Sequence, residues 1–369
     1  MSESPGLGDL ITIDQVMARA KKIVEPGAYA WAAAGAGQGV TTTRNAAALN
    51  RLALVPRVMR DVSQVDISSS FLGVPLAMPV ILAPVGALAL YDPGDSLASA
   101  EAATALGTSA VCASLASAPW EDVAATAPDR HFFQLYVFGD RSWIADIVDR
   151  VESAGFAGIC LTVDTPVIGR RDRSLEQRYT WAAPEGGSPN LVRHGLDYSY
   201  RSRHTWPDLE WLCARTDLPV ILKGVMNPAD AVEAVARGAE GIYVSNHGGR
   251  VVDHSLSTIE VLAEIVEALG DRAEVVVDSG FTRGSEVCKA LALGARAVGI
   301  GRLQCWGLAV GGVPGMIRVL EILRDEIANT MANIGSSTVA GITPDQVRWS
   351  IPAGPAPGVD DVFTDPIGR

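Results

Sequence analysis

A histidine and an arginine stand three positions apart in a glycine-rich segment that follows a short apolar run. The run at 241–245 reads as a buried strand, and the turn after it carries His247 and Arg250. An imidazole can accept a proton near neutral pH, and a guanidinium can hold a carboxylate. The pair therefore predicts removal of a proton from an anionic substrate. A loop histidine that only hydrogen-bonds the backbone is the commoner occurrence, so the rest of the chain must decide.

Such a site needs a scaffold, and the chain supplies alternating strands and helices from Pro79 onward. We predict strands at 80–83, 109–112, 132–136, 158–163, 219–223, 241–245, 275–278 and 297–300. Helical segments fall between them, for example at 96–106, 142–154, 228–237, 258–269 and 284–293. Eight such units predict an α/β fold, a (β/α)8 TIM barrel with its site at the carboxyl ends of the strands. No G-x-G-x-x-G follows an early strand, which makes a doubly wound sheet the weaker alternative.

Segments outside this alternation complete the expected organisation. Thr12 and Gln15 form a capping-box pattern that predicts an N-terminal helix ending near Pro26, and a second helix is expected over 29–34. The long loop at 172–206, after the fourth strand, is rich in Arg, Gly, Pro and aromatic residues, and we expect a lid there. The acidic tail at 352–369 is rich in Pro and Gly and is expected to be extended. The whole chain, 1–369, then forms a single barrel domain.

The composition of the chain argues against several kinds of partner and several kinds of site. The chain has 369 residues, 48% hydrophobic, enough for a large core, and a formal net charge of −12 that argues against nucleic acid or an anionic membrane as partner. Any anionic ligand must therefore meet a local basic pocket. The 5 cysteines show no C-x-x-C pair, so we expect neither a disulfide framework nor a metal site. The beginning of the chain carries no secretory signal pattern, and no apolar run reaches membrane-spanning length, so a soluble cytoplasmic protein is expected.

Polar residues end several of the predicted strands. Lys223 could be a Schiff-base nucleophile, a stabiliser of a developing anion or a phosphate anchor. Asp164 could hold a histidine in one tautomer, or it could only cap the next turn. Arg171 could grip a carboxylate or remain solvated. Glycine-rich ends after the seventh and eighth strands predict a phosphate site, with candidate residues Asp278, Gly280, Arg283, Gly301 and Arg302.

Four motifs occur in an order that resembles a known family. They are T-V-D-T-P-x-x-G-R-R, L-P-V-I-L-K-G-V, V-S-N-H-G-G-R and I-G-R. The chain from about Tyr29 to about Met331 resembles the FMN-dependent α-hydroxy acid oxidase and dehydrogenase family, which includes glycolate oxidase, lactate oxidase and mandelate dehydrogenase. The third motif, with the second upstream of it, is the most specific part of the likeness.

The resemblance implies a role for each strand-end residue. His247 is the base that takes the hydroxyl proton, and Asp164 orients it. Arg250 and Arg171 clamp the substrate carboxylate, and Tyr136 hydrogen-bonds near the reacting oxygen. Lys223 lies by the flavin ring. The remaining FMN-binding residues implied are Pro84, Val85, Gly86, Ser114, Gln134, Thr162 and Ser245 for the ring and ribityl parts, and Asp278, Gly280, Arg283, Gly301 and Arg302 for the phosphate end.

The chain also departs from the family pattern. Trp31 replaces a tyrosine that faces the substrate, and Leu115 replaces an aromatic residue present in glycolate-oxidising members. These changes favour a bulkier or aromatic hydroxy acid. In the phosphate loop, Thr282 stands where the family has arginine, which leaves Arg283 as the cation of that loop. Weaker binding of FMN is one consequence, and Arg302 carrying the charge instead is the other.

The favoured function is FMN-dependent oxidation of an L-2-hydroxy acid, bulky or aromatic and mandelate-like, to the 2-keto acid. Oxygen is the favoured electron acceptor, giving either peroxide or oxidative decarboxylation, and a quinone or protein acceptor stays open. Lys223 in a Schiff-base lyase barrel is one alternative, and an FMN barrel acting on another kind of substrate is a second. A flavin-binding protein that no longer turns over is a third. By analogy with the family, we expect a homotetramer.

Overall fold

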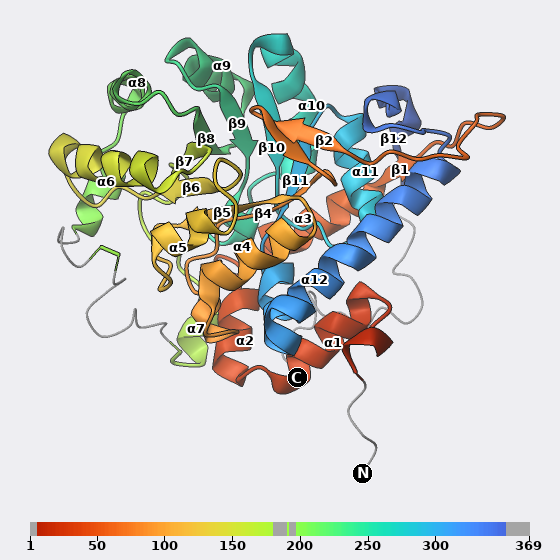
Figure 1. The fold of residues 1–369 in the computed structure, drawn as a ribbon, viewed down its shortest axis with the longest axis horizontal. Helices are drawn as coiled ribbons and strands as arrows, with labels where there is room; N and C mark the ends of the chain where they lie inside the picture. Colours follow the sequence, from red (N-terminus) through yellow and green to blue (C-terminus); the bar gives the residue numbers. More distant parts are fainter. Residues whose placement is uncertain (1–5, 180–189, 192–196, 352–369) are drawn as a thin grey trace.

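The chain folds around a closed barrel of parallel strands (Figure 1). The structure is a computed structural model that describes residues 6–179, 190–191 and 197–351. Each barrel strand pairs with the next one along the chain, and the last pairs with the first. The predicted (β/α)8 TIM barrel is confirmed. Its strands are β4 (Val80–Leu82), β5 (Ser109–Ala113), β6 (Phe132–Leu135), β7 (Gly158–Thr162), β8 (Val220–Val225), β9 (Gly241–Val244), β10 (Glu274–Val277) and β11 (Ala297–Ile300).

The helices surround the barrel or precede it. They are α1 (Ile13–Ile23), α2 (Pro26–Ala33), α3 (Val40–Arg51), α4 (Asp95–Ala105), α5 (Trp120–Ala125), α6 (Arg141–Ala154), α7 (Asp172–Glu176), α8 (Trp206–Arg215), α9 (Pro228–Ala236), α10 (Thr258–Leu269), α11 (Gly284–Ala292) and α12 (Arg302–Asn333). The capping box at Thr12 is present, because the Thr12 side chain accepts from the Gln15 amide. The second helix begins earlier than predicted, since Pro26 occupies its first turn, where no amide donor is needed.

Helix α3 was not predicted, and the reason lies in its buried face. Thr41, Thr42 and Asn45 are buried although they are polar, so the helix shows no apolar period. The hydroxyl of Thr41 donates to the Val252 carbonyl and that of Thr42 to the Gly248 carbonyl. The helix therefore uses hydrogen bonds, rather than apolar contacts, to hold the turn after β9.

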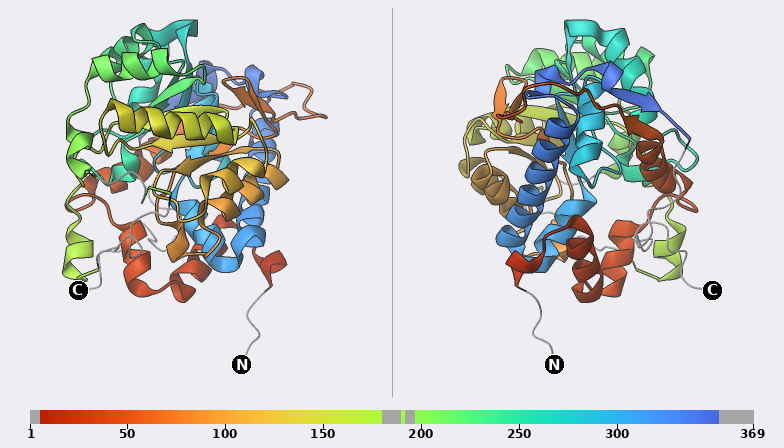
Figure 2. Two further views of the ribbon diagram at one scale, coloured as in Figure 1. Left: turned by 60° about the vertical axis from the view of Figure 1, so that its left-hand side comes forward. Right: turned by 90° about the vertical axis from the view of Figure 1, so that its right-hand side faces the viewer.

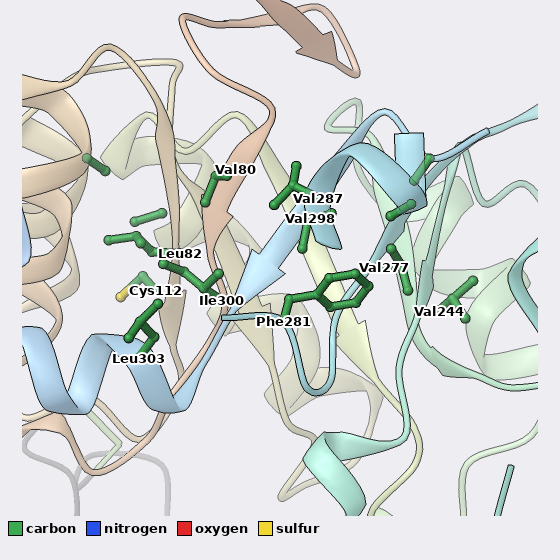
Figure 3. Packing of buried hydrophobic residues seen from close by; sticks show 14 of the residues in the cluster. Val80, Leu82, Cys112, Val244, Val277, Phe281, Val287, Val298, Ile300 and Leu303 are labelled. Atoms are coloured by element: carbon green, nitrogen blue, oxygen red, sulfur yellow. The ribbon is translucent and has the colours of Figure 1, made fainter. Parts of the chain in front are cut away.

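The two faces of the barrel strands pack against different partners. Val80, Leu82, Val298 and Ile300 face the surrounding helices, in the cluster of buried residues shown in Figure 3. The alternate residues, such as Ile81, point into the barrel, because side chains alternate along a strand. The hairpin of β2 (Ser69–Phe71) and β3 (Val74–Leu76) packs on those inward residues. It closes the amino-terminal end of the barrel and leaves the carboxyl end to the site.

Helix α12 packs along the barrel against α1, α4 and α11, and Figure 2 shows it in blue beside the red α1. By length and composition it could cross a bilayer, but 56% of its apolar stretch is buried within the protein. A core helix of a soluble protein can have the same length and apolar composition, so these two features alone are weak evidence for a membrane span. The helix is also interrupted, since Gly311 and Gly312 leave helical torsions just before Pro314.

The described residues cover only part of the expected lid and none of the expected tail. Within the lid at 172–206, the structure describes 172–179, which contain helix α7, residues 190–191 and the stretch at 197–206, which contains a 3-10 turn, η4 (Tyr198–Ser202). The tail at 352–369 lies outside the described residues. Just before it, β12 (Val347–Trp349) pairs with β1 (Leu52–Leu54), which ties the end of the described chain to the end of α3.

His131 gives the fold a pH dependence that can be measured. It is fully buried, its Nδ1 accepts from the Ala110 amide, and burial lowers its pKa from 6.5 to about 4. The unfolded chain therefore binds the extra proton first as pH falls. The imidazole should cost at most about 3 kcal/mol of unfolding free energy between neutral pH and pH 4.

The matched variant is His131→Gln, which keeps an acceptor for the Ala110 amide but does not titrate. Urea unfolding of both proteins across this pH range should show a flatter decline for the variant. Parallel declines in the two proteins would contradict the assignment.

Candidate active site

A cavity of about 780 Å³ opens at the carboxyl ends of the barrel strands. Most of the predicted site residues line it, namely Trp31, Pro84, Val85, Gly86, Leu115, Gln134, Tyr136, Thr162, Arg171, Lys223, His247, Arg250, Asp278, Gly280, Gly301 and Arg302. Asp164, Ser114 and Ser245 lie behind that lining and hydrogen-bond residues within it. Arg283 is the exception.

The turn after β9 holds His247 in an uncommon backbone conformation. Its φ is +57°, and Gly248 and Gly249 follow with φ of +67° and +73°. A side chain at Gly249 would collide with the Thr42 backbone nitrogen of α3. The glycines therefore let this turn lie against α3. His247 is the one residue of the three with a side chain, so its positive φ is strained, as is common at functional sites.

Two buried side-chain amides, those of Asn45 and Asn246, hold the same turn in place. Asn45 Nδ2 donates to Asn246 Oδ1 at 3.0 Å, and Asn246 Nδ2 donates back to Asn45 Oδ1 at 2.7 Å. Asn246 Oδ1 also accepts from the Gly249 amide. Sequence reasoning missed both asparagines as positioning residues, and only the place of Asn246 inside V-S-N-H-G-G-R could have pointed to one of them.

His247 and Asp164 form a hydrogen-bonded pair at the cavity wall. Nδ1 of His247 lies 3.0 Å from Asp164 Oδ1 and 3.2 Å from Oδ2. A carboxylate can only accept, so Nδ1 carries the proton and Nε2 is left as the free base. Burial would raise the pKa of Asp164, but the nearby His247 and Lys223 outweigh it and lower that pKa. Asp164 thus stays ionised beside the imidazole ring.

Tyr136 lies on the other side of the imidazole. Its hydroxyl is 3.4 Å from His247 Nε2. Burial raises the pKa of Tyr136 above its usual value, so the phenol keeps its proton and can donate. Tyr136 and His247 therefore present a donor and an acceptor next to each other at one point of the cavity.

Arg250 and Arg171 lie near the ring of Trp31, with their Cζ atoms 4.7 Å and 5.7 Å from its centroid. Arg250 Nη1 donates to the carbonyls of Trp31, Ala32 and Ala34, so it caps the carboxyl end of α2. Within the described residues, Arg171 Nε is buried and has no hydrogen-bond partner.

The pKa values of both arginines are lowered. Burial first, and then the neighbouring Arg171 and Arg302, lower the pKa of Arg250 to about 9. Burial likewise lowers the pKa of Arg171. An anion between the two guanidiniums would relieve this repulsion, so the pair is suited to a carboxylate.

Lys223 lies within β8, near its carboxyl end, and lines the cavity. Its Nζ donates to Ser245 Oγ at 2.8 Å and lies 3.6 Å from Asp278 Oδ2. Burial alone would lower the pKa of Lys223, but Asp278 and Asp164 outweigh it and raise that pKa. Lys223 is therefore a fixed cation and donor rather than a free amine.

The predicted phosphate end contains Arg302 but not Arg283. Arg302 lines the cavity and donates to the Gly248 carbonyl. Arg283 instead faces outward, pairing with Glu326 and Asp14 beside α12 and α1. The prediction of Arg283 as the cation of the phosphate loop is therefore wrong for this structure. Ser279, which was not predicted, lines the cavity, and its hydroxyl accepts from the Gly248 amide.

The floor of the cavity suits a flat ligand with polar edges. Gln134 Nε2 and Thr162 Oγ1 are buried without a partner among the described residues, and both residues line the cavity. Gly299 lies so close to Tyr243 that a side chain there would overlap the tyrosine hydroxyl. Unsatisfied polar groups in a cavity that glycine backbone also lines indicate a ligand that supplies the missing hydrogen bonds.

Comparison with known proteins decides the family. The model of the FMN-dependent dehydrogenase family matches residues 20–349. The chain belongs to the FMN-dependent dehydrogenase family.

Several family relatives match nearly the whole chain. The peroxisomal (S)-2-hydroxyacid oxidase GLO3 of Arabidopsis thaliana is 37% identical over 93% of this chain and 97% of its own. L-lactate oxidase of a Nostoc species is 38% identical, over 85% and 92%. A solved structure of a mandelate oxidase variant with (S)-mandelic acid has a TM-score of 0.86 at 35% identity, covering 92% of this chain and 99% of that one.

FMN is therefore the cofactor of this family member, and the cavity fits it. Lys223, Gln134 and Thr162 would meet the ring system, because all three line the cavity and Gln134 Nε2 and Thr162 Oγ1 have no partner among the described residues. Arg302 and the glycine backbone near Gly280 and Gly301 would hold the phosphate. When bound, FMN supplies the acceptor for the electron pair that leaves the substrate.

Proposed function

We propose that this chain oxidises an L-2-hydroxy acid to the 2-keto acid, with His247 as the base. The observation that carries the proposal is the free Nε2 of His247, fixed by Asp164 and placed beside Tyr136 and the two arginines in the FMN cavity. The names of the relatives, all 2-hydroxy acid oxidases, support the same reaction class. No other arrangement of titratable residues along the described cavity offers a comparable base.

The protein residues divide the proton chemistry between them. Arg171 and Arg250 hold the carboxylate, which places the hydroxyl between Tyr136 and His247. His247 Nε2 takes the hydroxyl proton as the α-hydrogen leaves with its electron pair. Asp164 stabilises the resulting imidazolium, and the 2-keto acid is left.

The Schiff-base alternative has less support. A lysine that forms an imine must give up its proton near neutral pH, which calls for a lowered pKa. Lys223 has a raised pKa and is held by Ser245 and Asp278. Its environment favours stabilising negative charge on a bound ring.

We infer a bulky or aromatic substrate from two cavity residues that depart from the family pattern, Trp31 in place of a tyrosine and Leu115 in place of an aromatic residue. Trp31 and Leu115 both line the cavity, together with Ile168 and Leu175, so the space beyond the arginines is largely apolar. Burial of a phenyl ring against such a wall is favourable by about 1.5–3 kcal/mol.

The test is kcat/KM for glycolate, L-lactate and (S)-mandelate in air-saturated buffer. We expect (S)-mandelate to exceed glycolate by about 10- to 100-fold. A preference for glycolate or lactate would contradict the inferred bulk. Peroxide formed in the same assay supports oxygen as acceptor, whereas turnover only with an added quinone would support a dehydrogenase.

We also propose a homotetramer, a cytoplasmic location and one catalytic unit over 1–369. Exposed apolar side chains such as Val58, Met59 and Val167 support contact between subunits. Some relatives are named as peroxisomal, so the location can differ within the family. Light scattering of the purified protein measures the assembly directly, and a monomeric mass would contradict it.

A further inference from the structure

Arg201 adds a guanidinium to the cavity that the family motifs do not include. It lies on the turn η4, lines the cavity, and its Cζ is 4.5 Å from the centroid of the Tyr136 ring. Its Nε is buried and has no hydrogen-bond partner among the described residues. The side chain thus lies over the tyrosine that contacts the base, with a donor still to be satisfied.

The other cations around the cavity already have a use. Lys223 pairs with Asp278, and the exposed Arg170 pairs with Asp172. Arg302 serves the phosphate end, and Arg171 with Arg250 serves the carboxylate of the substrate. In the part of the chain that the structure describes, no carboxylate lies within ion-pair distance of Arg201. A partly buried cation without a counter-ion is costly, so a ligand that supplies one is favoured.

We propose that Arg201 binds a second acidic group, carried on the side chain of the substrate, so that between 2-hydroxy acids of equal length the enzyme prefers the one with a second carboxylate. The inference rests on the proposed function, because it needs the first carboxylate at Arg171 and Arg250.

The geometry sets the reach of that side chain. The Tyr136 hydroxyl is 3.4 Å from His247 Nε2, and Arg201 stacks on the ring of the same tyrosine. Arg201 is therefore about one tyrosine ring away from the base. A side chain of a few carbons covers that span, and the apolar wall of the cavity accommodates its methylene or ring portion.

The test compares acids of equal carbon count that differ only in the second acidic group, (S)-2-hydroxyglutarate and (S)-2-hydroxypentanoate. Two readouts are used, kcat/KM and the dissociation constants of the unreactive 2-oxoglutarate and 2-oxopentanoate, followed by changes in the visible flavin spectrum. We expect the wild type to favour the diacid of each pair by about 10- to 100-fold, the worth of a charge-assisted hydrogen bond.

Variants separate charge from packing. Arg201→Met should remove the preference for the diacid and leave kcat/KM for 2-hydroxypentanoate within a few-fold, whereas Arg201→Lys should keep part of the preference. The control is Arg203→Met, because Arg203 directly follows the same turn, is exposed, lies over Tyr200 and does not line the cavity. It should retain the full preference.

The outcomes distinguish this inference from the proposed function. Equal affinities for the two keto acids, or a diacid preference that survives in Arg201→Met, would overturn the role of Arg201. If 2-hydroxypentanoate reduces the flavin under either outcome, the proposed oxidation still stands. If no hydroxy acid reduces it, the oxidation itself is wrong.

Discussion

Replacing His247 by alanine should leave a yellow protein that no hydroxy acid reduces. The base is lost, while the residues that would hold FMN, such as Lys223 and Gln134, are unchanged. A positioned general base contributes about 10²- to 10⁴-fold, so the rate of flavin reduction should fall by at least that range. Stopped-flow absorbance under anaerobic conditions measures this rate directly.

The matched control is His254→Ala, a change to an exposed histidine a few residues further along the same connection. It should reduce its flavin at the wild-type rate. If His247→Ala kept its flavin and still reduced it within a few-fold of wild type, His247 would not be the base. If it lost its colour, the histidine would contribute to holding the cofactor.

Replacing Arg171 by methionine should lower kcat/KM by about 100- to 1,000-fold, the worth of two hydrogen bonds to a charged group. The guanidinium is largely buried, with a free Nε near Trp31, so water cannot replace it at the carboxylate. Most of the loss should appear in KM and in the dissociation constant of the keto acid product. The length of methionine keeps the packing against Trp31.

Arg170→Met is the comparison for Arg171→Met. The Arg170 side chain is 79% exposed and pairs with Asp172, so its removal should change KM only a few-fold. Equal losses in the two variants would indicate a general effect of positive charge at the cavity mouth and would contradict a specific clamp.

The barrel could be predicted from sequence because its signals are local. Each strand is a short apolar run, such as the one that ends at Lys223, and a polar residue or glycine ends the run or follows it within a few positions. The order of these strand ends is enough to place His247, Asp164 and Arg250 at one end of the barrel. Helix α3 escaped prediction because Thr41 and Asn45 bury polar atoms, and no pattern of apolar residues marks that face.

The parts of the site that sequence reasoning missed depend on long-range contacts. The position of Arg283 in a loop favours a phosphate contact, but Glu326, distant in sequence, pairs with it and turns it outward. The amide pair of Asn45 and Asn246 joins residues of two distant segments. Arg201 lies in a long loop without a motif, so only its position over Tyr136 reveals it.

The most direct test of the account is an anaerobic titration of the purified wild-type protein with (S)-2-hydroxy acids. We predict a yellow protein whose flavin absorbance is bleached by at least one acid, with one equivalent of 2-keto acid formed per flavin. A yellow protein that no acid bleaches would contradict the account. A colourless protein whose substrate becomes covalently attached to Lys223 on treatment with borohydride would contradict it as well.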